Sequence, residues 1–186
     1  MGITNKYKMI EIEVKAKVED PKQIERSIIA LGGVPVGIEN HADTYYNSSV
    51  HDFQKTDEAL RIRAQDGRYF LTYKGPKMDK VSKTRLEHQV EIEDPDSMGE
   101  ILSALGFSPA AILIKKRKNY RIGDFFISLD DVRNLGNFIE IEISSKNSMN
   151  YEEKVESIFK LFEKLDISRD STIRKSYLEM LFEKQS

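Results

Sequence analysis

The sequence predicts an α+β fold in which about eight strands turn a charged face toward the inside of a β-barrel and α-helices cover the outside. Two observations predict it. Along the first expected strand, residues 10–17, four apolar side chains alternate with two glutamates and two lysines. The order strand, helix, strand, strand, strand then occurs twice along the 186 residues. A repeat of this kind predicts a pseudo-two-fold structure.

Composition restricts the class of protein. Hydrophobic residues make up 39% and charged residues 32%, so polar side chains must occupy much of the structured surface. The net charge of −2 gives no bulk attraction to nucleic acid or to a membrane. The absence of cysteine excludes disulfides and thiolate chemistry. Because no signal peptide and no run of about 18 apolar residues is found, the expected location is the cytoplasm.

The elements follow from local signals. In the first half we expect a strand at 10–17, a helix from Asp20-Pro21 to Gly32-Gly33, an extended stretch at 34–47, a polar connection at 53–58, and strands at 59–64 and 68–74. In the second half we expect a strand at 83–93, a helix from Asp94-Pro95 to Gly106, and strands at 111–122, 125–132 and 137–145. Two helices follow, at 151–165 with Asn150 as N-cap and at 172–183.

The repeat has a constant offset. Asp20 and Asp94, which open the first two helices, are 74 residues apart (94 − 20), and the same offset places Glu13 on Glu87. The repeat halves are expected at about 6–75 and 82–146, with the C-terminal helices at 150–183. No linker divides them, so residues 1–186 are assigned to a single domain.

Charged residues recur on one face of the expected strands. They are Glu11, Glu13 and Lys15, then Arg61 and Arg63, Lys74, Arg85 and Glu87, Lys115 and Arg117, Asp130, and Glu140 and Glu142. An open sheet with one wet face would also satisfy this alternation. Arginine, however, is the forked donor suited to phosphate oxygens. The two Glu-x-Glu pairs lie on the first and last strands, which would meet if eight strands closed. Four neighbouring carboxylates must be neutralised by cations or have raised pKa values. Hard divalent ions such as Mg²⁺ or Mn²⁺ are the natural partners, so with the basic residues the pattern indicates a site for metal-chelated polyphosphate.

At these residues the sequence resembles the CYTH superfamily, the triphosphate tunnel metalloenzymes, and in style its class IV adenylyl cyclase-like branch. The resemblance covers nearly the whole chain. It is carried by Glu11-Ile12-Glu13-Val14-Lys15, Leu60-Arg61-Ile62-Arg63, Leu71-Thr72-Tyr73-Lys74-Gly75-Pro76, Arg85-x-Glu87, Lys115-x-Arg117, the run from Leu129-Asp130 to Glu140-Ile141-Glu142, and Ser176-Tyr177-Leu178-Glu179. It implies an eight-stranded antiparallel closed β-barrel, open as a tunnel, that binds triphosphates with one or two Mg²⁺ or Mn²⁺ ions.

The resemblance also implies residue roles. The metal ligands would be Glu11, Glu13, Glu140 and Glu142, assisted by Glu87 and Asp130. The triphosphate would bind to Arg61, Arg63, Lys74, Arg85, Lys115 and Arg117. Glu13 and Lys15 would be catalytic, with Lys15 contacting phosphate or orienting the attacking water. Two alternatives stay open: Glu87 and Asp130 pair only with neighbouring basic residues, and Lys15 acts only electrostatically. The three histidines, His41, His51 and His88, show no ligand spacing and are interpreted as structural or surface residues.

Two reactions fit such a site. The first is metal-dependent hydrolysis of inorganic triphosphate or nucleoside triphosphates, and the second is conversion of ATP to cyclic AMP and pyrophosphate. Hydrolysis ranks first, because a cyclase also needs an adenine pocket, and the sequence identifies none beyond the stretch around Tyr45 and Tyr46. A non-catalytic polyphosphate-binding module ranks third. The expected partner is a small-molecule triphosphate such as tripolyphosphate or ATP, not nucleic acid or a membrane, and a homodimer stays open.

Overall fold

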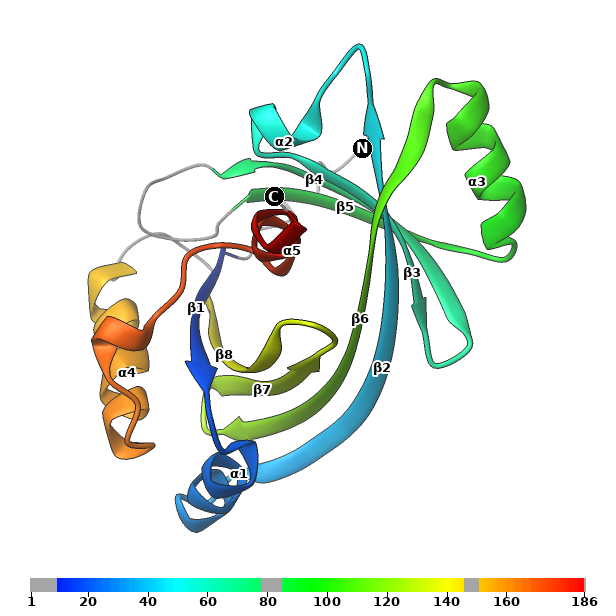
Figure 1. Cartoon of the computed structure of the whole chain (residues 1–186). Coiled ribbons are helices and arrows are strands. Elements are labelled where there is room, and N and C mark those ends of the chain that lie inside the picture. Colours follow the sequence, from blue (N-terminus) through cyan, green and yellow to red (C-terminus); the bar gives the residue numbers. More distant parts are fainter. Residues whose placement is uncertain (1–9, 78–84, 146–150, 186) are drawn as a thin grey trace, which may run out of the picture.

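The chain folds around one curled antiparallel sheet, seen in the computed structural model of residues 10–77, 85–145 and 151–185 (Figure 1). The eight strands lie in the order β1-β8-β7-β6-β2-β3-β4-β5. Their bounds are β1 Ile10–Val18, β2 Val34–Ser48, β3 Ala59–Gln65, β4 Arg68–Lys77, β5 Arg85–Ile92, β6 Phe107–Ile122, β7 Phe125–Val132 and β8 Gly136–Ser145. The predicted α+β fold with eight antiparallel strands is therefore confirmed.

The edges of the sheet are β1 and β5, and within the described ranges no ladder joins them. The first and last strands do pair, as predicted, but β1 is an edge of the sheet, so their pairing does not itself close a barrel. Among the strands that the structure describes, β5 pairs with β4 alone, and none of them bridges from β5 to β1. The structure thus gives a curled sheet, and closure into a barrel stays a prediction.

The helices have the bounds α1 Pro21–Ala30, α2 Phe53–Thr56, α3 Pro95–Ala104, α4 Tyr151–Lys164 and α5 Tyr177–Gln185, with a 3₁₀ turn at Arg169–Ser171. The sequence had predicted a polar connection where α2 lies. Asn150, the predicted cap of α4, lies outside the described residues. No helix in the described part of the chain is both long and apolar enough to cross a membrane.

α1 and α3 are built by the same local signals. The side chains of Asp20 and Asp94 each accept hydrogen bonds from two backbone N–H groups in the first turn. Each helix is followed by a glycine in the left-handed region, Gly32 with φ 86° and Gly106 with φ 88°. A helix therefore follows the first strand of each half, at the predicted offset.

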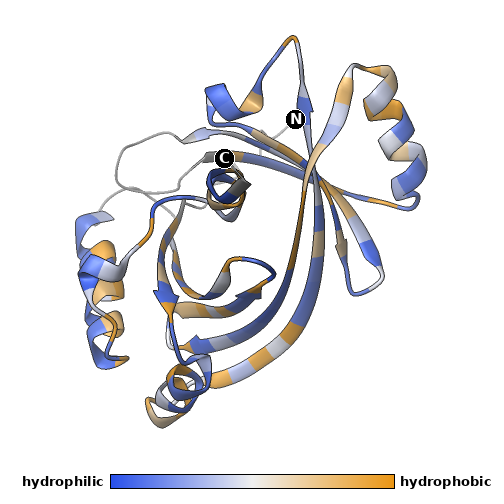
Figure 2. Ribbon diagram, viewed as in Figure 1, coloured by the Kyte–Doolittle hydropathy of each residue, from blue (hydrophilic) through white to orange (hydrophobic). Residues whose placement is uncertain are grey.

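The apolar side chains of the alternating strands form the main core, between the outer face of the sheet and the helices that cover it. Isoleucines of β1, β7 and β8 pack there against α1 and α4: Ile12, Ile127, Ile139, Ile141 and Ile143 meet Ile24, Ile28, Ile158 and Phe162. The outer face of β5 is less well covered, since Leu86 is 41% exposed and Val90 is 55% exposed. The strands carry both hydrophilic and hydrophobic residues (Figure 2). Because the hydrophobic side chains of β1 and β8 pack outside against α1 and α4, the charged ones face the inside of the curl.

α5 lies in the hollow of the sheet, not on its outside (Figure 1). The sequence had predicted this helix from residue 172, but residue 172 bridges to β1 and the chain is extended there. Ser176 and Glu179 then form a capping box, in which each backbone N–H donates to the other side chain. The helix therefore begins at Tyr177, whose ring packs on Phe138 of the inner face.

Gly33 tests the packing of α1 against the following strand. A Cβ added there would lie 2.4 Å from Ile28 Cγ2 and 2.7 Å from the Ile28 carbonyl oxygen. Gly33→Ala should lower the free energy of unfolding in urea by about 1–3 kcal/mol, the cost of overpacking. Gly37→Ala is the control, because a Cβ at Gly37 meets nothing within 4 Å. Equal stabilities of the two variants would contradict the close approach.

Candidate functional site

Every strand contributes a charged side chain to the inner face. The alternation of each strand and the curl of the sheet bring together Glu13 and Lys15, Asp43, Arg61 and Arg63, Lys74, Glu87, Lys115 and Arg117, Asp130, and Glu140 and Glu142. Several are almost fully buried, including Lys15 and Asp43 at 1% exposed each. Charges are buried to this degree only when they are paired and hydrogen-bonded. Two clusters and two cross-strand pairs, Lys15–Glu140 and Lys74–Glu87, provide the partners.

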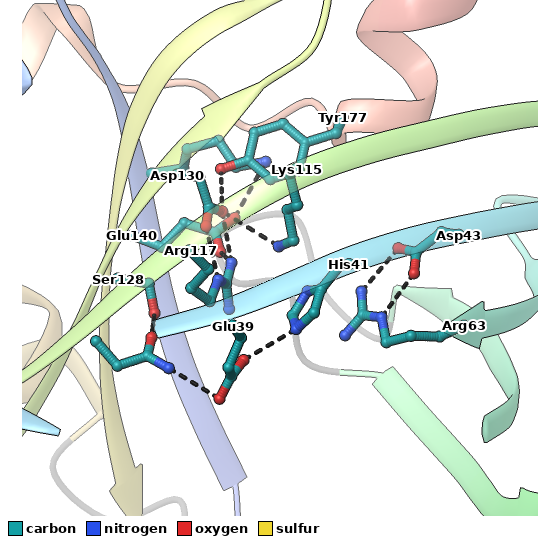
Figure 3. A network of polar contacts seen from close by, with 12 residues as sticks. Glu39, His41, Asp43, Arg63, Lys115, Arg117, Ser128, Asp130, Glu140 and Tyr177 are labelled. Atoms are coloured by element: carbon teal, nitrogen blue, oxygen red, sulfur yellow. Dashed lines mark hydrogen bonds and ion pairs between the residues drawn. The ribbon is translucent and has the colours of Figure 1, made fainter. Parts of the chain in front are cut away.

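The first, the Asp130 cluster, consists of Asp130, Lys115, Arg117 and Tyr177 (Figure 3). Arg117 donates to both Asp130 oxygens at 2.7 and 2.6 Å, Lys115 Nζ lies 3.2 Å from Oδ2, and the Tyr177 hydroxyl donates at 2.8 Å. Burial by itself raises the pKa of Asp130, but the hydrogen bonds from Arg117 and the charge of Lys115 lower it below its usual value. Burial and the charge of Arg117 in turn lower the pKa of Lys115 to about 8.

The second, the Asp43 cluster, consists of Asp43, Arg61 and Arg63. Arg63 binds Asp43 through two hydrogen bonds of 2.6 and 2.7 Å, and Arg61 donates at 3.2 Å. Burial raises the pKa of Asp43, but the hydrogen bonds from Arg63 and the charge of Arg61 bring it down to about 2. Both clusters therefore hold two cations on one ionised carboxylate.

The clusters lie in corresponding ladders of the two halves, but the acidic and basic residues exchange strands. Asp43 lies opposite Arg63 in the β2–β3 ladder, and Arg117 lies opposite Asp130 in the β6–β7 ladder. Asp43 and Arg117 are separated by the repeat offset of 74 residues (117 − 43). The acid of the first pair thus corresponds to the base of the second.

The β1–β8 ladder joins Lys15 to Glu140. The two residues face each other in the ladder, with Nζ 3.3 Å from Oε1, and Arg117 also binds Glu140. Lys15 Nζ further donates to the carbonyl oxygen of Lys175 at 3.2 Å and lies 3.7 Å from the centroid of the Tyr177 ring. Lys15 therefore fastens the segment that begins α5 to the inner face.

Glu13 and Glu142 face each other in the same ladder, two residues along from Lys15 and Glu140. Like charges directly opposite each other destabilise a ladder. Carboxylate oxygens are also the donors that hard divalent ions prefer, so this donor set fits Mg²⁺ or Mn²⁺. Within residues 10–77, 85–145 and 151–185, however, no group of three or more His, Asp or Glu residues is arranged to hold a metal ion. The side chain of Glu11 lies outside the described residues, and the metal site stays a prediction.

The other predicted binding residues are placed as follows. Arg61, Arg63, Lys115 and Arg117 lie in the two clusters, and Lys74 Nζ lies 2.7 Å from Glu87 Oε2. Glu87 and Asp130 are thus each bonded to basic residues, and whether they also assist metal binding stays a prediction. The side chain of Arg85 lies outside the described residues.

Three residues of the inner face were not among the predicted site residues: Asp43, Tyr177 and His41, the last of which was interpreted as structural or surface. The alternation along β2 could have identified Asp43 and His41, because it places them on one face with Glu39. Nothing in the local sequence signals the contact between Tyr177 and Asp130, which are 47 residues apart. That contact depends on α5 entering the hollow.

Comparisons with known proteins agree with this geometry. The CYTH domain model matches residues 9–177. The Methanocaldococcus jannaschii protein “Putative adenylate cyclase MJ0240” is 42% identical over 172 residues, covering 92% of this chain and 98% of that protein.

Solved structures agree as well. The PH1819 protein of Pyrococcus horikoshii OT3 has a TM-score of 0.83 and 42% identity, covering 94% of this chain and 99% of that one. HpAC1 from Hippeastrum, described as having a dominant triphosphatase activity, has a TM-score of 0.69 at 18% identity and covers 96% and 97% of the two chains. The likeness to HpAC1 concerns the fold alone. The predicted resemblance is confirmed: this chain belongs to the CYTH domain family.

Proposed function

We propose that this chain is a divalent-metal-dependent triphosphatase, which hydrolyses inorganic triphosphate, nucleoside triphosphates or both. The observation that carries the proposal is the inner face, where cations from β1, β3, β4 and β6 and the paired glutamates of β1 and β8 line one hollow. A ligand that contacts both sets needs many anionic oxygens and a bound cation. A metal-chelated triphosphate has both.

The clusters support the phosphate-binding role. Asp43 and Asp130 each hold two cations, so each cluster keeps one positive charge in excess. A guanidinium group has five N–H donors, and Arg63 uses two of them on Asp43. The remaining donors are held in fixed positions before the substrate arrives. Such preorganised donors stabilise the charge that builds up on phosphate oxygens during transfer.

The metal would be held by Glu13, Glu140 and Glu142 together with Glu11. When bound, Mg²⁺ or Mn²⁺ neutralises phosphate charge and activates a water molecule for attack. The four hydrogen bonds to Asp130 favour a positioning role for this residue, which orients Lys115 and Arg117. Lys15, bonded to Glu140, would orient that carboxylate and add positive charge beside the phosphates.

A closed tunnel is part of the proposal. Burial and the charge of Arg61 lower the pKa of Lys74, while the charges of Glu87 and Glu13 raise it. Glu13 lies on β1 and Lys74 on β4, next to the opposite edge strand. The charge of Glu13 on the edge strand β1 thus acts on Lys74, one strand in from the other edge, which supports a tunnel.

The alternative function is conversion of ATP to cyclic AMP and pyrophosphate. The observation that favours it is the name of the 42% identical relative from M. jannaschii. The same basic residues would hold the triphosphate, and the ribose 3′-hydroxyl in place of water would attack, at the α-phosphorus. Hydrolysis requires no base-specific pocket and for that reason remains the first proposal.

Product analysis distinguishes the two reactions. The protein is incubated with Mg²⁺ or Mn²⁺ and either tripolyphosphate or ATP, and phosphate, pyrophosphate, ADP and cyclic AMP are resolved. We expect phosphate and pyrophosphate from tripolyphosphate, with removal of the metal by chelator abolishing the reaction. Cyclic AMP and pyrophosphate as the main products from ATP would instead identify a cyclase.

Glu13→Gln tests the metal half of the site. The amide keeps the shape of the side chain but removes its charge, so Mn²⁺ affinity and turnover should both fall by at least about tenfold, equivalent to about 1.4 kcal/mol. Glu19→Gln is the matched control, an exposed glutamate just beyond the end of β1. Mn²⁺ binding is measured by calorimetry. Wild-type affinity in Glu13→Gln would remove this residue from the metal site.

Arg63→Ala tests the phosphate half. Loss of charge-assisted hydrogen bonds worth about 1.5–3 kcal/mol should raise the KM for tripolyphosphate by about 10- to 100-fold. Arg26→Ala, which removes an exposed arginine of α1, is the control and should leave KM unchanged. If both variants keep the wild-type KM, Arg63 does not contact the substrate.

A further inference from the structure

His41 occupies the middle of the inner face. It is 3% exposed and lies between the Asp43 cluster and the Asp130 cluster (Figure 3). Its Nε2 is 2.9 Å from Glu39 Oε2, and Glu39 Oε1 accepts a hydrogen bond of 2.9 Å from Asn119. Asn119 in turn accepts from Ser128. A chain of hydrogen bonds across β2, β6 and β7 therefore holds the imidazole ring in one orientation.

The two ring nitrogens of His41 differ in their surroundings. A carboxylate only accepts hydrogen bonds, so Nε2 carries the proton that is donated to Glu39. Nδ1 of the neutral ring is then an acceptor. This atom is buried and has no hydrogen-bond partner among the residues that the structure describes. Because buried polar atoms are nearly always satisfied, an unpartnered acceptor beside Arg63 and Lys115, which are proposed to bind the triphosphate, points to a partner that binds there.

The charges around the ring determine how a bound ligand changes the protonation of His41. Each element packed beside His41 contributes: Glu39 and Asp43 from β2, Arg63 from β3, and Lys115 and Arg117 from β6. Burial and the charges of Arg63 and Lys115 lower the pKa of His41 to about 3, so the ring is neutral at neutral pH. The cations that keep the ring neutral are those proposed to bind the triphosphate.

A bound triphosphate would reverse this balance. Its negative charge offsets Arg63, Lys115 and Arg117, while a bare Nδ1 lone pair facing phosphate oxygens would be repulsive. We propose that His41 belongs to the triphosphate site, and that its Nδ1 takes up a proton from solvent when the polyanion binds and donates it to a phosphate oxygen. The inference rests on the proposed function. It makes triphosphate affinity fall as pH rises, because the proton becomes scarcer.

The direct test is the protonation state of the wild-type ring. Nitrogen-15 NMR of the three histidines is recorded at pH 6.5, with and without Mg²⁺ and diimidotriphosphate, in which NH groups replace the bridging oxygens. This pH lies below the value of about 8 for Lys115, so that lysine is already mostly charged and adds little proton uptake. We expect Nδ1 of His41 to change from unprotonated to protonated in the complex. An unprotonated Nδ1 in the saturated complex would overturn the inference.

Calorimetry of the same ligand in buffers of different ionisation enthalpy counts the protons taken up. His41→Gln should take up fewer protons than wild type, by up to about one, because a single imidazole is removed. The control is His88→Gln on β5, an exposed histidine, which should match wild type. Equal proton uptake in His41→Gln and wild type would overturn the inference.

The outcomes separate this inference from the proposed function. Binding without proton uptake at His41 overturns the inference alone. Proton uptake at His41, in a protein that releases no phosphate from tripolyphosphate, overturns hydrolysis alone. Absence of binding overturns both.

Discussion

The ion pair between Lys15 and Glu140 is the interaction on which the rest of the inner face depends. It joins the first strand of the chain to the last, and the same ammonium group binds the segment that leads into α5. Lys15 is 1% exposed, so loss of Glu140 would leave a buried charge with fewer partners. Lys15 thereby helps to fix α5 against the inner face, where Tyr177 donates to Asp130, the carboxylate that orients Lys115 and Arg117.

Ion pairing within the two clusters explains how so many charges can be buried together. One face of the sheet is apolar and packs against helices, so the charged side chains of the alternation lie on the opposite face. Curling of the sheet encloses that face. The desolvation free energy of an isolated buried charge would be prohibitive, but Asp43 and Asp130 each bind two cations through several hydrogen bonds. In both the β2–β3 and the β6–β7 ladder an arginine faces an aspartate, with acid and base exchanged between the strands.

The sequence predicted the strands, the two capped helices and the inward face because those features are set by short-range signals. Alternation with period two assigns Glu13 and Lys15 to one face, and Asp-Pro with a later glycine defines α1 and α3. Helix α5 was placed too early because its start depends on an extended contact with β1, which has no local signal.

The ion-pair partner of each charged residue could not be predicted from the sequence either. Which carboxylate meets which cation depends on strand register, and a shift of one residue would exchange the two faces of a strand. The role of Asp130 as the acceptor of Arg117, Lys115 and Tyr177 follows from the register of β6 on β7 and from α5. The surroundings of His41 follow from the register of β2 against both its neighbours.

The central claim is that the inner face binds a metal-chelated triphosphate. Paramagnetic broadening of backbone NMR signals by Mn²⁺, with diimidotriphosphate bound, tests it most directly. We predict that broadening centres on β1 and β8 around Glu13 and Glu142, with weaker effects at Arg63 and Arg117 and none at outer positions such as Arg26 of α1. Broadening centred on the outer face, or Mn²⁺ binding that ignores the triphosphate, would contradict the account.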